Sequence, residues 1–176
     1  SEVVCRVIAN NPSVTQYFVL PAMAKDDVER LDKSSIHMLY LFKGEELEDA
    51  IDNSDIHFQV VKDKNKLSAR GIRDNEKILI VDDFIGSGKT IEESFEVHNI
   101  KDEGLKIEDV IVLSLVAHEK GVSYLKDIGV PQIFYNKLIN RGISDNYIGK
   151  KKSEYVRLMN QIESRIPKLD EENRFG

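Results

Sequence analysis

The sequence predicts an α/β protein with a single central, mostly parallel sheet flanked by helices, followed by a helical extension at the C-terminal end. Its 176 residues are enough for one sizeable core and too few for two comfortable ones. Short apolar runs alternate with segments of helical periodicity, which is the sequence form of parallel strands joined by crossover helices. The four consecutive apolar residues Ile78–Val81 are typical of a central strand covered on both faces.

In the first half of the chain, the segment Ile36–Phe42 fits either a strand or the start of a buried helix, because periodicity does not separate the two over so few residues. The polar connection Lys62–Asn75 is expected to be a mobile loop, since it is long and rich in basic side chains. The other expected elements are an extended run at Val14–Pro21, a short polar helix at Lys25–Leu31, a weak helix at Glu45–Ile51 and a strand at His57–Val61.

The second half predicts successive strand and helix units after Ile78–Val81. The expected elements are a helix at Thr90–Ile100, a strand at Val110–Val116, a helix at Glu119–Asp127 and a strand at Gln132–Tyr135. Residues 1–136 are therefore expected to form the α/β core. Residues 137–176 are polar and are expected to form a partly helical extension, in which Ser153–Ile166 spaces its apolar residues like an amphipathic helix.

The composition is that of a globular domain, with 41% hydrophobic and 32% charged residues. A net charge of -6 argues against a dominant nucleic-acid or acidic-membrane surface, and the apolar runs are too short to span a membrane. Cys5 is the only cysteine, so an internal disulfide is excluded. Together with the lack of a leader before the first strand-like segment, this favours a cytoplasmic location. The uncapped ends favour a fragment of a longer protein.

The most informative segment joins a buried strand to a small-residue loop. Asp82 and Asp83 follow Ile78–Val81 directly, and the loop Gly86–Thr90 comes next. Ligands of open α/β sheets bind at the carboxyl ends of strands, and the backbone amides of a helix N-terminus favour anions. The glycines let the backbone wrap a phosphate, and neighbouring carboxylates accept hydrogen bonds from the hydroxyls of a sugar. The segment therefore predicts a site for a phosphorylated sugar.

Two other interpretations fit parts of this segment. The acids could simply cap the following helix, but the combination of an apolar strand, two acids and a small-residue loop is more demanding than capping requires. The ending Gly88-Lys89-Thr90 also suggests a P-loop, whose pattern needs glycine at position 83, where this chain has Asp83. A carboxylate there would face the triphosphate, so hydrolysis of a nucleoside triphosphate is kept only as a minor alternative.

The segment resembles the ribose-phosphate binding motif of type I phosphoribosyltransferases, in which apolar residues precede two acids and a Thr/Gly-rich loop. Phe58–Lys62 and the basic connection after it look like the strand and flexible loop of orotate-type members, and Val112–Val122 is similar to their next strand and its Glu-x-Gly helix. The likeness covers roughly residues 14–136. The form of Asp82–Thr90 and the final Glu172–Gly176 also look like a phosphoribosyltransferase-like group with a C-terminal extension from bacterial conflict and defence systems.

The resemblance implies a protein that binds phosphoribosyl pyrophosphate, or a related ribose 5-phosphate ligand, and transfers phosphoribose to a nitrogenous base. Asp82 and Asp83 would hold the ribose hydroxyls and act in catalysis, with Mg²⁺ reached through the sugar, pyrophosphate and water; Asp83 is preferred beside the anomeric centre. The residues implied to bind the 5′-phosphate are Ile85, Gly86, Ser87, Gly88, Lys89 and Thr90. Those implied to bind pyrophosphate are Lys33, Ser34, Ser35, Lys62, Lys64 and Lys66.

Two places depart from the family pattern. Lys89 stands where the family usually has Thr or Gly, and Asp32–Ser35 matches the pyrophosphate-binding turn poorly. Phe84 and Ile85 could face the base, but packing in the core is the favoured interpretation. The four histidines lack metal-ligand spacing and are expected to be structural.

The resemblance implies partners as well as a reaction. They are phosphoribosyl pyrophosphate or a nucleotide, a nitrogenous base, and either a second copy of the chain or a partner protein of a defence system. The sequence gives no membrane signal and no strong nucleic-acid signal. The alternative to an enzyme is a regulatory or defence module that uses the same pocket to bind a nucleotide without turnover.

Overall fold

The structure is a computed structural model that describes residues 2–25, 39, 55–61, 71–100, 105–140 and 149–163. The chain forms two compact units, Ser1–Ile139 and Asn140–Gly176. The first unit contains the sheet, and the second contains the helix α8 (Gly149–Glu163). No described helix is long and apolar enough to cross a membrane.

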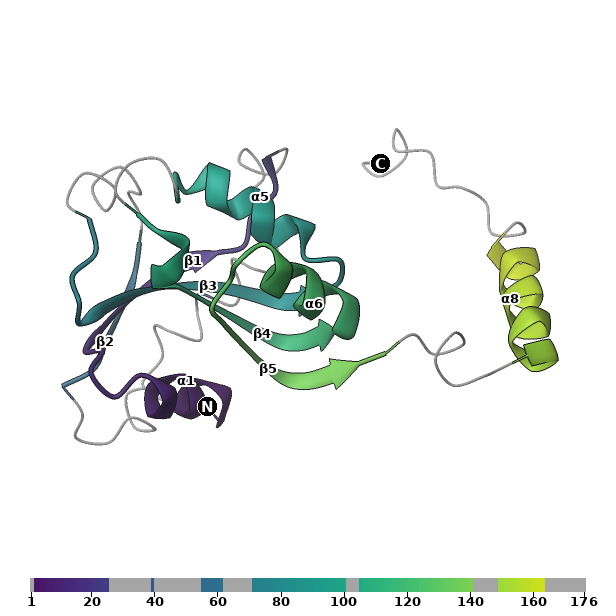
Figure 1. The fold of residues 1–176 in the computed structure, drawn as a ribbon, viewed down its shortest axis with the longest axis horizontal. Coiled ribbons are helices and arrows are strands. Elements are labelled where there is room, and N and C mark those ends of the chain that lie inside the picture. Colours follow the sequence, from purple (N-terminus) through teal and green to yellow (C-terminus); the bar gives the residue numbers. More distant parts are fainter. Residues whose placement is uncertain are drawn as a thin grey trace, which may run out of the picture. The chain divides into compact units, whose positions relative to one another are not determined.

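A five-stranded parallel sheet forms the centre of the first unit, in the spatial order β2-β1-β3-β4-β5 (Figure 1). Its strands are β1 (Gln16–Pro21), β2 (His57–Val60), β3 (Glu76–Ile85), β4 (Val110–His118) and β5 (Gln132–Ile139). The predicted α/β class is confirmed. The apolar run Ile78–Val81 lies in β3, the middle strand, as predicted.

Helices cover both faces of the sheet, as Figure 1 shows. The helices α5 and α6 lie on one face, and α1 lies on the other. A short 3₁₀ helix, η2, leads into β4. The bounds of these elements are Glu2–Asn10 for α1, Lys89–Val97 for α5, Ile107–Asp109 for η2 and Glu119–Asp127 for α6.

The apolar side chains of β3 divide between two core layers. Ile78 and Ile80 pack with α5 and α6, and Leu79 and Val81 pack in the layer that contains α1. All four side chains are fully buried. Successive residues of a strand point to opposite faces, so a strand with helices on both sides needs an apolar residue at every position. This explains the unbroken run in the sequence.

The alternation of β3 changes beyond Val81. Ile80 and Ile85 are an odd number of residues apart, yet both pack in the layer with α5 and α6, and Val112 and Ala117 of β4 do the same. The two strands keep one register throughout this change, up to the pair Ile85↔Ala117. The side chains of both strands therefore change faces of the sheet in the same stretch. This change brings Phe84 to the surface, where the residue is 47% exposed.

Most predicted elements are present, with shifted ends. The strand that was expected to stop at Val81 continues to Ile85, because its ladder with β4 continues past the two acids. The helix α1 was not predicted. The predicted segments Val14–Pro21, His57–Val61, Val110–Val116 and Gln132–Tyr135 correspond to β1, β2, β4 and β5, Glu119–Asp127 is α6, and Thr90–Ile100 and Ser153–Ile166 overlap α5 and α8.

Three predicted segments fall almost wholly outside the described residues, and a fourth falls there in part. Leu39, within the segment left open between strand and helix, is described and is helical. Of the connection between β2 and β3, only residues 71–75 are described. The segments concerned are Lys25–Leu31, Ile36–Phe42, Glu45–Ile51 and Lys62–Asn75.

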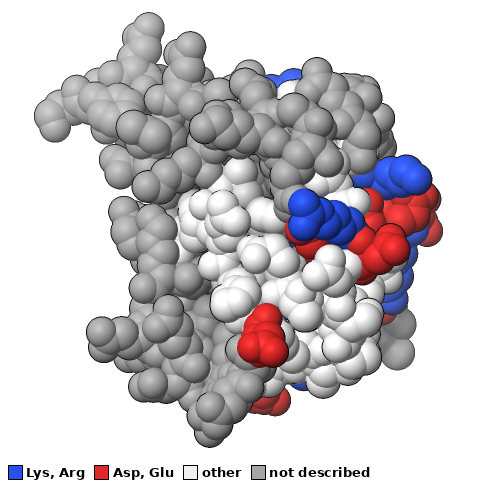
Figure 2. All heavy atoms as spheres, turned by 90° about the vertical axis from the view of Figure 1, so that its left-hand side faces the viewer, with Lys and Arg blue, Asp and Glu red and all other residues white. Residues whose placement is uncertain are grey.

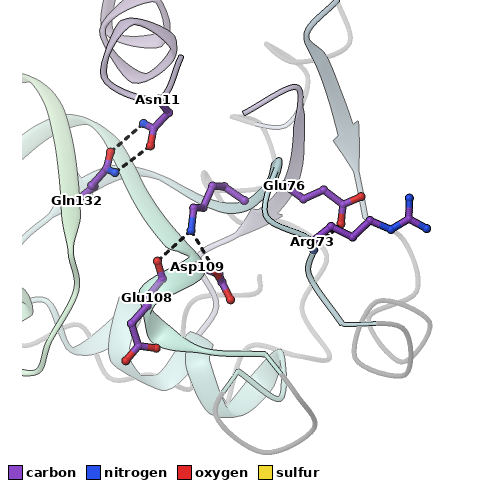
Figure 3. A network of polar contacts seen from close by, with 7 residues as sticks. Asn11, Arg73, Glu76, Glu108, Asp109 and Gln132 are labelled. Atoms are coloured by element: carbon purple, nitrogen blue, oxygen red, sulfur yellow. Dashed lines mark hydrogen bonds and ion pairs between the residues drawn. The ribbon is translucent and has the colours of Figure 1, made fainter. Parts of the chain in front are cut away.

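Polar side chains at the amino-terminal edge of the sheet pair with one another (Figure 3). Asn11, just after α1, and Gln132 exchange two amide hydrogen bonds of 2.8 and 2.9 Å. Lys77 Nζ donates to Asp109 Oδ1 at 2.9 Å and to the carbonyl of Glu108 at 3.2 Å. Figure 2 faces the left-hand side of Figure 1; at the right of this view, acidic and basic side chains lie next to one another. The groups at this edge stabilise the fold.

Candidate ligand-binding site

A pocket of about 230 Å³ opens at the carboxyl end of β3. It contains part of the predicted site: one of the two acids, and most of the small-residue loop between β3 and α5. Asp83 and Lys89 are not among the residues that line it. The lining residues are Asp82, Phe84, Ile85, Gly86, Ser87, Gly88, Thr90 and Ile91.

The order of the strands explains why a pocket forms here. β1 lies between β2 and β3, so the chain leaves β1 toward one side of the sheet and returns through β3 on the other side. In open α/β sheets, ligands bind at such a reversal, outside the carboxyl ends of the strands. The pocket lies at the carboxyl end of β3, one of the two strands that border this reversal.

Asp82 is the buried acid of the pocket, with its residue only 7% exposed. Its Oδ1 accepts a hydrogen bond from the backbone N–H of Asp83 at 3.0 Å. Burial raises the pKa of Asp82 to about 7, and the charge of Asp83 and a side-chain hydrogen bond with it act in the same direction.

The loop from Gly86 to Gly88 presents backbone donors. Gly88, the N-cap residue of α5, has a φ of +85°, a left-handed conformation that favours glycine, and the N–H of Lys89 donates to Ser87 Oγ at 3.4 Å. Within the described part of the chain, no acceptor takes the backbone N–H groups of Ser87 or Gly88. Uncapped amides at a helix N-terminus attract anions. The hydroxyls of Ser87 and Thr90 lie in the same lining.

Phe84 and Ile85 differ in environment. Ile85 is 1% exposed and packs under α5 and α6, as predicted for a core residue. The same prediction is wrong for Phe84, which is 47% exposed and lines the pocket. A Cβ at Gly86 would lie 3.2 Å from Phe84 Cε1, so the absence of a side chain at position 86 leaves room for the ring.

Two buried side chains, Ser94 of α5 and His98 at its C-cap, bond to the chain at and just after the end of β1, and the sequence interpretation missed this role. Ser94 Oγ accepts from the N–H of Met23 at 2.7 Å and contacts the carbonyls of Met23 and Thr90. His98 Nε2 lies 2.8 Å from the carbonyl of Pro21, which fits the structural role expected of the histidines. The sequence did contain a signal for this role: Ser94 and His98 are polar, lie four residues apart, and share a helix face that is otherwise apolar.

The acids of the site belong to the class of ligands that Mg²⁺ prefers. In the described residues, no three His, Cys, Asp or Glu side chains form a metal-binding cluster. Asp82 and Asp83 supply the carboxylate oxygens that Mg²⁺ prefers, and this ion normally keeps waters and substrate phosphates as its other ligands.

The six residues implied to bind pyrophosphate lie outside the described residues: Lys33, Ser34, Ser35, Lys62, Lys64 and Lys66.

The buried carboxyl of Asp82 predicts a free energy of unfolding that falls as pH rises. Its pKa of about 7 in the folded protein lies above its ordinary value of 3.8. Between these pH values the folded protein keeps a proton that the unfolded chain releases, so raising the pH favours unfolding. Asp82→Asn should therefore become more stable relative to the wild type from about pH 4 to about pH 8, by on the order of 2–4 kcal/mol.

Urea unfolding of both proteins across this pH range measures the effect of Asp82→Asn. Asp127→Asn, on the exposed last turn of α6, controls for the loss of one negative charge. A stability difference between Asp82→Asn and the wild type that stays constant with pH would contradict the prediction.

Comparison with known proteins places the chain in a family. A hypoxanthine/guanine phosphoribosyltransferase from Methanosalsum zhilinae is 36% identical over 67 residues; the match covers 38% of this chain and 33% of that protein, about a third of its length. The Helicobacter pylori xanthine-guanine-hypoxanthine phosphoribosyltransferase structure has 15% identity and a TM-score of 0.34, over 91% of this chain and 88% of that one. The PRTase-CE model, phosphoribosyltransferase with a C-terminal extension, matches residues 13–173, and the chain belongs to this family.

Proposed function

We propose that this protein binds phosphoribosyl pyrophosphate with Mg²⁺ and transfers the phosphoribosyl group to a nitrogenous base. The observation that carries the proposal is the pocket at the carboxyl end of β3, where a buried acid lies beside a loop whose Ser87 and Gly88 N–H groups have no acceptor among the described residues. A phosphorylated sugar needs both groups within one pocket, since its phosphate accepts hydrogen bonds and its hydroxyls donate them. Membership of the PRTase-CE family supports the same ligand.

The phosphate of the ligand binds at the loop of the pocket, and its ribose binds at the acids. The loop Gly86–Thr90 binds the 5′-phosphate through backbone N–H groups and the hydroxyls of Ser87 and Thr90. Asp82 and Asp83 accept hydrogen bonds from the ribose hydroxyls. Asp82 lines the pocket, and Asp83, which does not line it, is hydrogen-bonded to Asp82. A cation near the bound ligand favours the ionised form of Asp82, since a nearby positive charge lowers the pKa of a carboxyl.

In the proposed reaction, a ring nitrogen of the base attacks the anomeric carbon, and the bond from that carbon to the pyrophosphate oxygen breaks. Pyrophosphate leaves with the electron pair. Positive charge develops on the sugar as the bond breaks, and the carboxylates of Asp82 and Asp83 stabilise that charge. Mg²⁺ supplies positive charge to the pyrophosphate when it is bound. The loop fixes the sugar by its phosphate, so the reaction gains from the orientation of the two reactants.

Phe84 is the group proposed to contact the base. Its ring is half-exposed, lies over Gly86, and lines the pocket beside Asp82. A flat aromatic face suits a planar base, and such pairs contribute about 0.5–1.5 kcal/mol beyond the area they bury. Because the matched relative is a hypoxanthine/guanine phosphoribosyltransferase, these two bases come first in the panel to be tested.

The second candidate is a binding module without turnover. One observation favours it: among the described lining residues, Asp82 is the only ionisable side chain, so no second acid–base group faces the acceptor. Incubation with labelled phosphoribosyl pyrophosphate, Mg²⁺ and a panel of bases separates the two candidates. Release of pyrophosphate that depends on a base indicates the transferase. Tight binding without release indicates the module.

Replacing both acids should remove ligand binding while leaving the fold intact. Asp82→Asn/Asp83→Asn removes two charged acceptors for the ribose hydroxyls without opening a core cavity, and a hydrogen bond to a charged group contributes about 1.5–3 kcal/mol. Affinity for phosphoribosyl pyrophosphate with Mg²⁺, measured by calorimetry, should fall by about a hundredfold or more. Thr90→Val, which removes one hydroxyl, should cost about tenfold or less. Unchanged affinity in the double variant refutes the assignment, and a lost melting transition indicates that the acids are structural.

Shortening Phe84 should weaken binding of the base without changing binding of the sugar phosphate. Phe84→Ala removes an exposed ring, so the expected loss is about threefold to tenfold in affinity for hypoxanthine or guanine, measured with phosphoribosyl pyrophosphate present. The matched control is Leu115→Ala, which also removes a half-exposed apolar side chain, in β4, outside the lining residues. Equal affinities for the base in Phe84→Ala and the control would rule out contact between this ring and the base.

A further inference from the structure

The N-terminal half of α6 approaches the loop Gly86–Gly88 so closely that neither partner has room for a larger side chain. A Cβ on Gly121 would lie 2.5 Å from the carbonyl oxygen of Gly86 and 2.8 Å from Ile85 Cγ2. A Cβ on Gly88 would lie 3.0 Å from Tyr124 Cδ1 and 3.1 Å from the carbonyl oxygen of Gly121. Much of this contact involves backbone atoms, which cannot move aside as the end of a flexible side chain can.

The contact fixes the direction of one peptide group. The Cβ position of Gly121 is closer to the carbonyl oxygen of Gly86, at 2.5 Å, than to its carbonyl carbon, at 3.1 Å, so this carbonyl points toward α6. In a trans peptide the N–H points opposite to the C=O. The N–H of Ser87 therefore points away from α6, and it has no acceptor in the described part of the chain.

A second contact joins α6 to the first turn of α5. Tyr124 OH donates to Glu92 Oε2 at 2.5 Å. Glu92 is the acidic residue of that first turn, and its backbone N–H bonds to the carbonyl of Gly88 at 3.1 Å. A carboxylate close to an anion site weakens anion binding by repulsion. The bond to Tyr124 holds this carboxylate on the side of α6.

We propose that Gly121 and Tyr124 are positioning residues for the phosphate end of the site: Gly121 sets the peptide that aims the Ser87 N–H at the ligand, and Tyr124 holds Glu92 away from it. The inference rests on the proposed function, since it concerns the phosphate of the same ligand. Neither residue lines the pocket, so each acts through the loop or through α5.

Substitution of Gly121 tests the peptide orientation. Alanine is intrinsically the better residue inside a helix, so Gly121→Ala harms the protein only through its contacts with Gly86 and Ile85. Ribose 5-phosphate is titrated into ¹⁵N-labelled protein, and the amide resonances of Ser87 and Gly88 are followed. We expect Gly121→Ala, with an otherwise native spectrum, to bind about tenfold more weakly and to lose the shift of the Ser87 amide. Ser123→Ala, at an exposed position of α6, should match the wild type.

The Tyr124 pair decides the outcome if Gly121→Ala does not fold. Tyr124→Phe keeps the ring against Gly88 and loses only the hydroxyl, so it should bind ribose 5-phosphate about threefold more weakly. Adding Glu92→Gln should restore the affinity, because the repelling charge is gone. A role in stability alone would shift the melting temperature of Tyr124→Phe and leave its affinity unchanged.

Each other outcome overturns one statement. A folded Gly121→Ala variant that binds ribose 5-phosphate with wild-type affinity and wild-type amide shifts overturns the positioning role and leaves the proposed function intact. The same conclusion follows if the wild type binds ribose 5-phosphate without a shift in the amide resonances of Ser87 and Gly88. If Gly121→Ala is unfolded, unchanged affinity in Tyr124→Phe overturns the positioning role. Wild-type protein that binds neither ribose 5-phosphate nor phosphoribosyl pyrophosphate refutes the proposed function, and this inference with it.

Discussion

The pairing of β3 with β4 is the constraint on which the site depends. The two strands keep one register from Ile78↔Val110 to Ile85↔Ala117, past both acids. This continued ladder carries the chain to the carboxyl edge of the sheet before it turns at Gly86, where α6 packs against it. It also keeps Asp82 beside Ser114, inside the sheet and away from water. The position of the acid and the shape of the loop are thus consequences of one set of strand contacts.

Burial of Asp82 is unfavourable for its charged form, and the pocket gives a reason for keeping an acid there. A carboxyl with a pKa near 7 changes its charge readily when a cation or a hydroxyl-rich ligand arrives. At the opposite edge of the sheet, Lys77 is paired with Asp109, and Asn11 with Gln132 (Figure 3). Polar side chains thus pair with one another at this edge, whereas the buried Asp82 at the other edge lines a pocket.

Much of this could be predicted from the sequence, because the signals were local. The run Ile78–Val81 predicted a strand buried on both faces, and the helical period of Glu119–Asp127 predicted α6 at its observed bounds. The extension of β3 to Ile85 could not be predicted from acids and glycines that usually mark a turn, because only the ladder with β4 reveals it. The exposure of Phe84 follows from the same change in alternation.

The role of Gly121 depends on contact between residues far apart in the chain, which no local pattern records. The central claim is that the loop Gly86–Thr90 binds the phosphate of the ligand. A crystal structure of the protein with ribose 5-phosphate and Mg²⁺ measures this directly. The account predicts phosphate oxygens within about 3 Å of the backbone nitrogens of Ser87 and Gly88, with the ribose hydroxyls at Asp82. A phosphate bound elsewhere, with this loop in contact only with water, would contradict it.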